Sequence, residues 1–408
     1  MSRADHFKTF LALLFCTSLS FLSCQKNDNR PLPTAAPESV GMSSEHLSLI
    51  SSLLQEAIDR GDTPGAVILV ARKGKVIMNE AFGESQRVPE SRPLGVSMLF
   101  DVASLTKPVA TATSIMILVE RGRIRLWDCV NEFIPGFAPY VDENGKQGKD
   151  ARLWHLLTHT SGLPPDMTVD EVADTFGRSC SLEEMVDHIG SIKKLDSPGN
   201  SFHYSCLGFI VLGAIVEKVS GKPISEFAEE HIFKPLSMNN TFFCPSEEDF
   251  VRCIPTLIIE GSSLKGIVHD HKARALGGVS GNAGLFSTAE DLAVFAQMML
   301  NKGEYRGVRI LNPLTVERMT SVFPEAAFSG RGLGWDLDSA YSTNGGDIFG
   351  PRSYGHTGYT GTSIWIDPDT QTFIILLTNS VHPDDTRDVI SLRSKVANVV
   401  ASSIDRNS

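Results

Sequence analysis

Hydrophobic and polar positions in the first part of the folded chain follow two periods. In residues 43–61, apolar side chains recur at helical spacing after two serines and stop at Gly61, which is typical of a helix with a serine cap and a glycine end. Residues 65–72 and 76–82 are two apolar runs on either side of a short turn that contains Gly74. This order predicts a helix followed by a β-hairpin.

The middle of the chain keeps the helical period. Residues 109–119 are apolar or small on every side, which indicates a helix that is buried all round, and Gly122 is a suitable end for it. Residues 208–221 show the same pattern, and Ser287 is expected to open a further helix as the first residue of a capping box. Between residues 127 and 290, strand signals are few.

The period changes again in the last part of the chain. Three apolar runs bounded by turn residues predict strands, and a helical pattern closes the sequence. The predicted strands are residues 332–337, 362–367 and 372–378, and the predicted helix is residues 388–404.

Strands near both ends of the chain, around a helical middle, imply one antiparallel sheet built from both parts. The predicted fold class is α/β, in an α+β arrangement of two lobes. A domain of residues 43–405 would contain a sheet lobe (about 43–100 and 300–405), flanked by helices, and an inserted, mostly helical lobe (about 104–290). A functional site is expected between the lobes.

The N-terminal pattern predicts an export signal. Basic residues precede an apolar run, residues 10–23, that is too short to span a bilayer, so residues 1–23 are interpreted as a signal peptide. The run ends in Phe-Leu-Ser-Cys24, which resembles a bacterial lipobox and predicts lipidation of Cys24; ordinary cleavage without a lipid is the alternative. The proline-containing residues 24–42 would tether an exported lipoprotein to the periplasmic or cell-surface side of a membrane.

Composition limits the partners. With 42% hydrophobic and 21% charged residues, the chain is of ordinary globular type. The net charge of −11, with no compensating basic cluster, argues against nucleic acid and against an anionic membrane surface as a main partner. Contact with a membrane is expected only through the N-terminal lipid.

The cysteines do not indicate a disulfide framework. Five remain outside the signal region and the lipobox, and an odd number cannot all pair. Cys244 and Cys253 are the closest pair in sequence, but no spacing forms a C-x-x-C metal clip.

The first chemical motif is Ser104-Leu-Thr-Lys107. At helical spacing these two side chains lie one turn apart on the same face, so the amine of Lys107 can reach the hydroxyl of Ser104. Burial would lower the pKa of Lys107 and allow it to accept the proton of a nucleophilic Ser104. The helix N-terminus would favour negative charge there. The alternative is a surface turn with a solvated lysine.

Two histidine pairs have spacings that can bind metal. His155 and His159 are four residues apart but lack the glutamate of an H-E-x-x-H motif, so a structural role is preferred. His269-Asp270-His271 lacks the further ligands of a metallo-hydrolase. Neither a metal nor another cofactor is therefore expected.

Three elements in order now resemble one family. Ser104 with Lys107, Tyr204 with Cys206, and the stretch 355–358 (GHTG) are similar to the S-x-x-K, Y-x-N and K-T-G or H-T-G motifs of serine β-lactamases and penicillin-binding proteins. The resemblance covers nearly all of residues 41–402. It is closest to class C β-lactamases, D-alanyl carboxypeptidases and the related esterases, and it implies their β-lactamase-like fold.

The resemblance implies catalytic roles by position. Ser104 would attack a carbonyl carbon, Lys107 and Tyr204 would move its proton, and the backbone N–H groups of Ser104 and Tyr359 would form the oxyanion hole. Since a free phenol is a poor base at neutral pH, Tyr204 would need Lys107 to lower its pKa.

The remaining motif residues are expected to bind substrate, with two departures from the family. Cys206 stands where the family usually has asparagine, and His356 replaces the lysine of β-lactamases. Together with Thr357, Gly358 and Tyr359 they would line the site, but with fewer fixed partners for an amide and a carboxylate.

The expected function is therefore hydrolysis through an acyl-enzyme of small esters or of peptidoglycan-like D-amino-acid peptides. A β-lactamase, a penicillin-binding sensor and a silent scaffold without turnover are the alternatives. A G-x-S-x-G elbow would indicate an α/β-hydrolase, and the sequence contains none.

Overall fold

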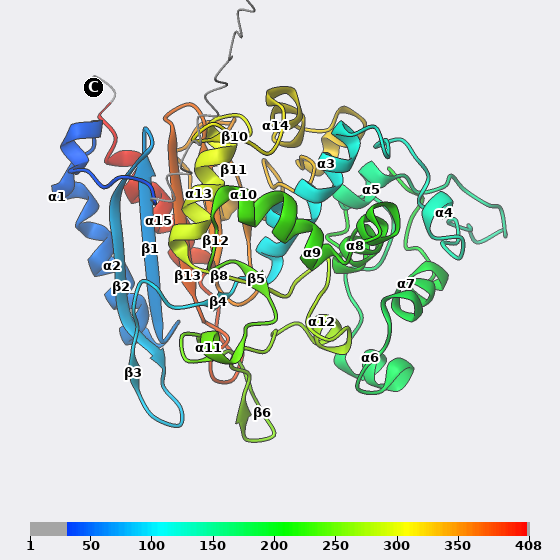
Figure 1. The fold of residues 1–408 in the computed structure, drawn as a ribbon, viewed down its shortest axis with the longest axis horizontal. Coiled ribbons are helices and arrows are strands. Elements are labelled where there is room, and N and C mark those ends of the chain that lie inside the picture. Colours follow the sequence, from blue (N-terminus) through cyan, green and yellow to red (C-terminus); the bar gives the residue numbers. More distant parts are fainter. Residues whose placement is uncertain (1–30, 406–408) are drawn as a thin grey trace, which may run out of the picture.

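An antiparallel sheet of six strands forms one side of the molecule in the computed structural model, which describes residues 31–405 (Figure 1). The strands stand in the order β11-β12-β13-β1-β2-β3, so three from the C-terminal part lie beside three from the N-terminal part. They are β1 (Gly65–Arg72), β2 (Lys75–Gln86), β3 (Arg92–Pro93), β11 (Tyr354–Thr357), β12 (Ser363–Asp367) and β13 (Thr372–Thr378). The prediction of one antiparallel sheet from both parts of the chain is confirmed.

The predicted hairpin forms the centre of this sheet. β1 and β2 are joined by Lys73 and Gly74, whose φ values of 51° and 76° lie in the left-handed region that suits a two-residue hairpin turn. All residues of β1 are buried, because it also pairs with β13, where Ala66 lies opposite Thr378. The two ends of the chain are thus locked together through β1.

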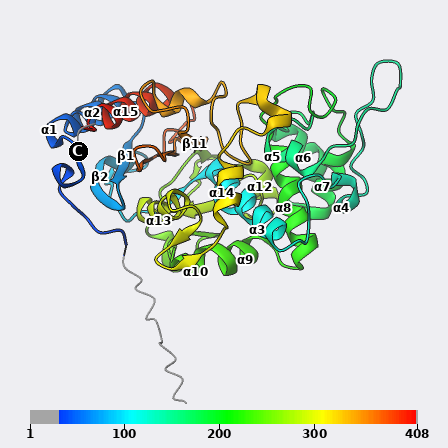
Figure 2. The same ribbon diagram turned by 90° about the horizontal axis from the view of Figure 1, so that it is seen from above.

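Helices cover both faces of the sheet. α2 (Leu49–Arg60) and α15 (Ile390–Ser402) lie on one face, and α13 (Ala289–Leu300) packs against β1, β12 and β13 on the other (Figure 2). The N-terminal helical pattern is split into α1 (Ser44–Leu47) and α2, with the expected Ser43 cap and Gly61 end. The cap of α13 is Thr288 rather than Ser287, because the Thr288 hydroxyl accepts the N–H of Asp291.

The other helices gather beside the sheet (Figure 1). A small sheet of order β4-β8-β5 lies between the two groups. The remaining α-helices and strands are α3 (Thr113–Glu120), α4 (Val130–Phe133), α5 (Leu153–Leu157), α6 (Val169–Phe176), α7 (Leu182–Ser191), α8 (Cys206–Ser220), α9 (Ile224–Ala228), α10 (Lys234–Leu236), α11 (Glu247–Phe250), α12 (His271–Ala275), α14 (Pro313–Met319), β4 (Phe100–Asp101), β5 (Phe242–Phe243), β6 (Ile258–Ile259), β7 (Ser262–Ser263), β8 (Leu285–Ser287), β9 (Glu304–Tyr305) and β10 (Val308–Arg309).

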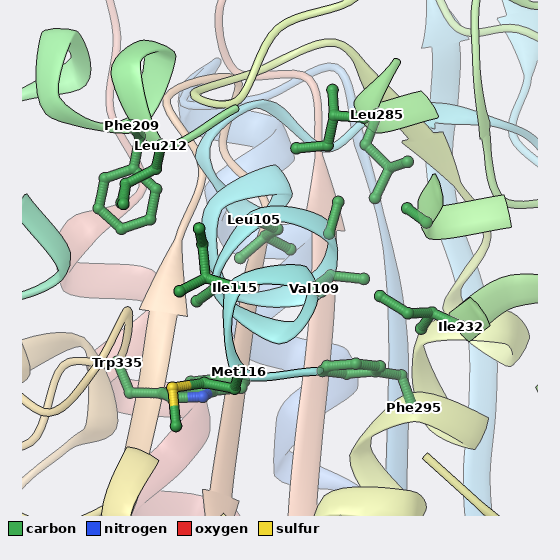
Figure 3. Close-up of a cluster of buried hydrophobic side chains, with 14 of the residues drawn as sticks. Leu105, Val109, Ile115, Met116, Phe209, Leu212, Ile232, Leu285, Phe295 and Trp335 are labelled. Atoms are coloured by element: carbon green, nitrogen blue, oxygen red, sulfur yellow. The ribbon is translucent and has the colours of Figure 1, made fainter. Parts of the chain in front are cut away.

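The helix that follows Ser104 is buried on every side, as its sequence predicts. It begins as a 3-10 turn, η2 (Ala103–Leu105), continues as a π-helix, η3 (Lys107–Ala112), and ends as α3. Figure 3 shows its apolar side chains between those of the neighbouring helices and the turn that carries Trp335. This central position fixes Ser104 relative to both groups of elements.

One predicted strand is wrong, and one strand of the sheet was not predicted. Residues 332–337 form a turn rather than a strand, because Asp336 makes only isolated bridges, to Arg331 and to Gly355. The edge strand beside β12 is instead β11, whose residues pair with β12. Its sequence, Tyr-Gly-His-Thr, has no long apolar run to mark it.

The predicted tether is too long. Leu32, Val40 and Met42 are buried, and the Ala35 N–H donates a 2.9 Å hydrogen bond to the carbonyl of Val76, so residues 31–42 belong to the folded domain. Apolar side chains among the prolines explain this packing. The signal peptide and Cys24 lie outside the described residues. Within residues 31–405, no helix is long and apolar enough to cross a membrane.

Candidate active site

Ser104 and Lys107 form the pair that their spacing predicts. The Lys107 ammonium donates hydrogen bonds to Ser104 Oγ at 2.8 Å and to the carbonyl of Asn282 at 3.0 Å. Lys107 is fully buried, whereas Ser104 lines a cavity of about 460 Å³. A surface turn with a solvated lysine is therefore excluded.

The turn before the helix presents Ser104 to the cavity. Ala103 has a φ of 47°, an uncommon conformation for a residue with a side chain. The Asp101 carboxylate supports it by accepting the N–H of Ala103 at 2.9 Å. Burial raises the pKa of Asp101 to about 6. The strained turn is thus held by a buried side chain.

Tyr204 lies over this pair. Lys107 Nζ is 5.2 Å from the centre of its ring, and His159 stacks on it with ring centres 4.3 Å apart. His159 Nδ1 accepts the N–H of Ser205, the N-cap residue of α8, so it orients the segment that carries Tyr204. His155 accepts the N–H of Arg152 in the same way. Both histidines therefore have the structural role preferred from the sequence.

The protonation states differ from those expected. Burial lowers the pKa of Lys107, but its interactions with Cys206 and Tyr204 outweigh this effect, and the pKa is raised. Burial raises the pKa of Tyr204. The charge of Lys107 and a hydrogen bond with Ser104 lower it, but their effect is smaller, so the pKa is raised. The prediction of a lowered lysine pKa is wrong, because it counted burial and not the partners. Because Cys206 and Tyr204 raise the pKa of Lys107 only in their ionised forms, the Lys107 ammonium and the Tyr204 phenolate stabilise each other, and the raised pKa of Tyr204 makes the neutral phenol its main form at neutral pH.

These states determine which group can act as base. A charged Lys107 has no lone pair and can only donate to Ser104 Oγ. Tyr204 in its phenolate form is then the group that can accept the proton of Ser104. Because its pKa is raised, the phenolate is the minor form at neutral pH.

The opposite wall of the cavity comes from the end of β11 and the loop after it. The hydroxyls of Thr360 and Thr362 donate to the carbonyls of Asp101 and Val102 at 2.8 and 3.0 Å, which ties this loop to the turn before Ser104. A Cβ on Gly358 would lie 2.5 Å from the Val102 carbonyl, so glycine is required there.

The predicted oxyanion donors remain consistent with this geometry. Within residues 31–405 the backbone N–H of Tyr359 has no hydrogen-bond partner, and its residue lines the cavity together with Ser104. Arg393, from α15, donates to the carbonyls of Gly358 and Thr362 at 2.9 and 3.0 Å. It thereby supports the loop on both sides of Tyr359.

The two departures from the family motifs are structurally distinct. His356 lines the cavity beside Thr357 and Gly358, and burial lowers its pKa well below its usual range, so it is neutral there. Cys206 lies 3.5 Å from Lys107 Nζ, and burial raises the pKa of its thiol. Cys206 is not among the residues that line the cavity, which departs from the substrate-binding role expected for it.

Other residues that line the cavity carry no signal in the sequence. The cavity is also lined by four residues that belong to no recognised motif: Arg331, Asp336, Tyr341 and Arg393.

The five cysteines of the described chain are free, including Cys244 and Cys253. Within residues 31–405, no group of three or more histidine, cysteine or acidic side chains is placed to hold a metal.

A family model described as Beta-lactamase matches residues 50–397. This chain belongs to the β-lactamase family. A Bacillus subtilis (strain 168) protein named N-acetylmuramyl-L-alanine amidase is 33% identical over 379 residues, which cover 85% of this chain and 83% of that protein. A Salmonella schwarzengrund (strain CVM19633) protein, named as a D-alanyl-D-alanine carboxypeptidase, is 32% identical over 383 residues, 86% of each chain.

Solved structures of low sequence identity share the fold of this chain. EstCE1, described as a hydrolase with promiscuous acyltransferase activity, has a TM-score of 0.72 at 23% identity and covers 88% of this chain and 99% of its own. The octameric penicillin-binding protein homologue from Pyrococcus abyssi has a TM-score of 0.66 at 23% identity, over 88% of this chain and 78% of its own. These structures bear out the predicted fold class, and the family match makes the chain a serine hydrolase of the β-lactamase family.

The raised pKa of Tyr204 predicts an alkaline pH profile. A base with a raised pKa gains its active form as pH rises, so kcat/KM for a small ester should increase between about pH 7 and pH 9, by up to about tenfold per pH unit. Spontaneous hydrolysis is subtracted with Ser104→Ala as the blank. A plateau reached below about pH 8 would instead indicate a base with a lowered pKa, such as a neutral Lys107.

Proposed function

We propose that this chain hydrolyses small esters or cell-wall-like D-amino-acid peptides through an acyl-enzyme on Ser104. The observation that carries the proposal is the hydrogen bond from a buried Lys107 ammonium to Ser104 Oγ, with Tyr204 beside both in an open cavity. The relatives named as a carboxypeptidase and an amidase support peptides of the cell wall as substrates.

Acylation follows from the positions of these groups. Ser104 Oγ bonds to the carbonyl carbon of the substrate while its proton passes to the Tyr204 phenolate. The N–H groups of Ser104 and Tyr359 bind the resulting oxyanion. Its collapse breaks the bond to the leaving group, which takes the proton from Tyr204. Water then repeats the sequence, and Tyr204 accepts its proton and returns it to Ser104 as the acyl group leaves.

The two motif departures argue for esters or peptides over β-lactams. A neutral His356 offers no fixed charge to a substrate carboxylate. Cys206 lies beside Lys107 and outside the cavity lining, so it offers no amide to a substrate side chain. A hydrogen bond to a charged group contributes about 1.5–3 kcal/mol, or about 10- to 150-fold in rate when it acts in the transition state. A small ester requires only the nucleophile, the base and the oxyanion donors.

The substrate preference is tested by direct comparison. At neutral pH, kcat/KM for a short-chain acyl ester should exceed that for a cephalosporin, and Ser104→Ala should remove both activities. Replacing His356→Lys together with Cys206→Asn should move the ratio toward the cephalosporin, by at least about 10-fold. Faster hydrolysis of the cephalosporin by the unmodified protein would contradict this account of the two residues.

We also propose that the protein is exported and anchored by a lipid on Cys24, because Cys24 follows the lipobox-like end of the signal sequence. Expressed at full length in bacteria with labelled fatty acid, the protein should incorporate label and partition with membranes. Cys24→Ser should abolish both, while Cys16→Ser, inside the apolar run, should abolish neither. Labelling that persists in Cys24→Ser would exclude the proposed anchor.

A further inference from the structure

A buried arginine lies behind the catalytic tyrosine. The side chain of Arg331 is only 1% exposed, and its Nη1 approaches Asp336 Oδ2 at 3.4 Å, longer than a strong charged hydrogen bond. Within residues 31–405, its Nε and Nη2 have no hydrogen-bond partner. The carboxylate therefore neutralises the guanidinium only in part.

Arg331 faces Tyr204 through the aromatic ring. Its guanidinium carbon is 5.8 Å from the centre of the Tyr204 ring and 6.0 Å from that of Phe202. Attraction between a cation and an aromatic face increases when the face becomes more negative. Loss of the phenolic proton adds a full negative charge to Tyr204, so its interaction with Arg331 strengthens on deprotonation.

The turn that carries Arg331 is fixed to both sides of the site. Gly334 donates its N–H to the Leu157 carbonyl at 3.0 Å, and a Cβ on Gly334 would lie 2.5 Å from that of Ala112 on η3. Asp336 exchanges two backbone hydrogen bonds of 2.9 Å with Gly355 on β11. Arg331 cannot move away from Tyr204 without disturbing these contacts.

Two cations and several neutral groups surround Tyr204. Lys107 faces the ring from η3, and Arg331 faces it from the 331–336 turn. Burial lowers the pKa of His159, which follows α5, and of His356 on β11, so both are neutral. Burial raises the pKa of the Cys206 thiol on α8. The other neighbours are Ser104 on η2 and Tyr341, whose ring centre is 5.4 Å from that of Tyr204. Asp336 is the carboxylate in contact with Arg331.

We propose that Arg331 is a positioning residue of the proton relay. Its partly neutralised charge stabilises the deprotonated form of Tyr204, which is the form that accepts the proton of Ser104. Arg331 itself exchanges no proton: the proton leaves Ser104 Oγ, bonds to the phenolate oxygen and passes to the leaving group. Arg331 thus supplies a second positive charge beside the base where His356 supplies none. The inference rests on the proposed function.

Opposite charge changes test this role. Arg331→Met should lower kcat/KM for a neutral short-chain ester about 10-fold at pH 7 and displace the rising limb of the pH profile upward by about one pH unit, while Arg331→Lys should retain most of the activity. Asp336→Asn removes the countercharge and keeps an oxygen for the hydroxyl of Ser339, which bonds Asp336 at 2.7 Å. Asp336→Asn should displace the limb to lower pH.

Three results would overturn the proposal. One is a pH limb that does not move in Arg331→Met or Asp336→Asn, proteins whose thermal melting shows that they fold. A second is displacement of the rising limb in the same direction in Arg331→Met and in Asp336→Asn. A third is a loss confined to KM for esters with an anionic leaving group, which would make Arg331 a substrate-binding residue. Absence of turnover in the unmodified protein would contradict the proposed function instead.

Discussion

The buried ammonium of Lys107 is the constraint on which the site depends. A charge away from water is costly unless hydrogen bonds and nearby groups compensate it. Here Ser104 Oγ and the Asn282 carbonyl accept its hydrogen bonds, and the rings of Tyr204 and Phe209 lie 5.2 and 5.8 Å from Nζ. Segments far apart in the sequence therefore meet around Lys107 Nζ, and this arrangement brings the proposed catalytic residues together.

The sheet contributes the second half of the site. Thr360 and Thr362 bind the loop after β11 to the turn before Ser104, and Arg393 supports the same loop from α15. Since α15 packs on the face of the sheet opposite α13, the position of the proposed oxyanion donor, the N–H of Tyr359, depends on the whole layered arrangement. Conversely, Lys107 depends on the helical core. Ser104, the proposed nucleophile, lies where the two parts join.

The sequence predicted the features that local patterns encode. Ser104, Lys107 and Tyr204 belong to spaced motifs, and the β1–β2 hairpin and the buried helix follow from apolar runs. Arg331 and Arg393 gave no such signal, because each reaches the site only through tertiary packing. β11 was missed since its four residues have no strand period. The lysine pKa was predicted wrongly because its direction depends on Cys206 and Tyr204, neighbours that only the fold reveals.

The central claim is that Ser104, held by a charged Lys107, forms the covalent intermediate. Its most direct test is reaction with a serine-reactive organophosphorus probe, followed by intact mass and peptide mapping. The account predicts one adduct per chain, on Ser104, and none in Ser104→Ala. Lys107→Met should react far more slowly, by about 100-fold or more, since it removes the charged donor to Oγ. An adduct on another residue, or full labelling of Ser104→Ala, would contradict the account.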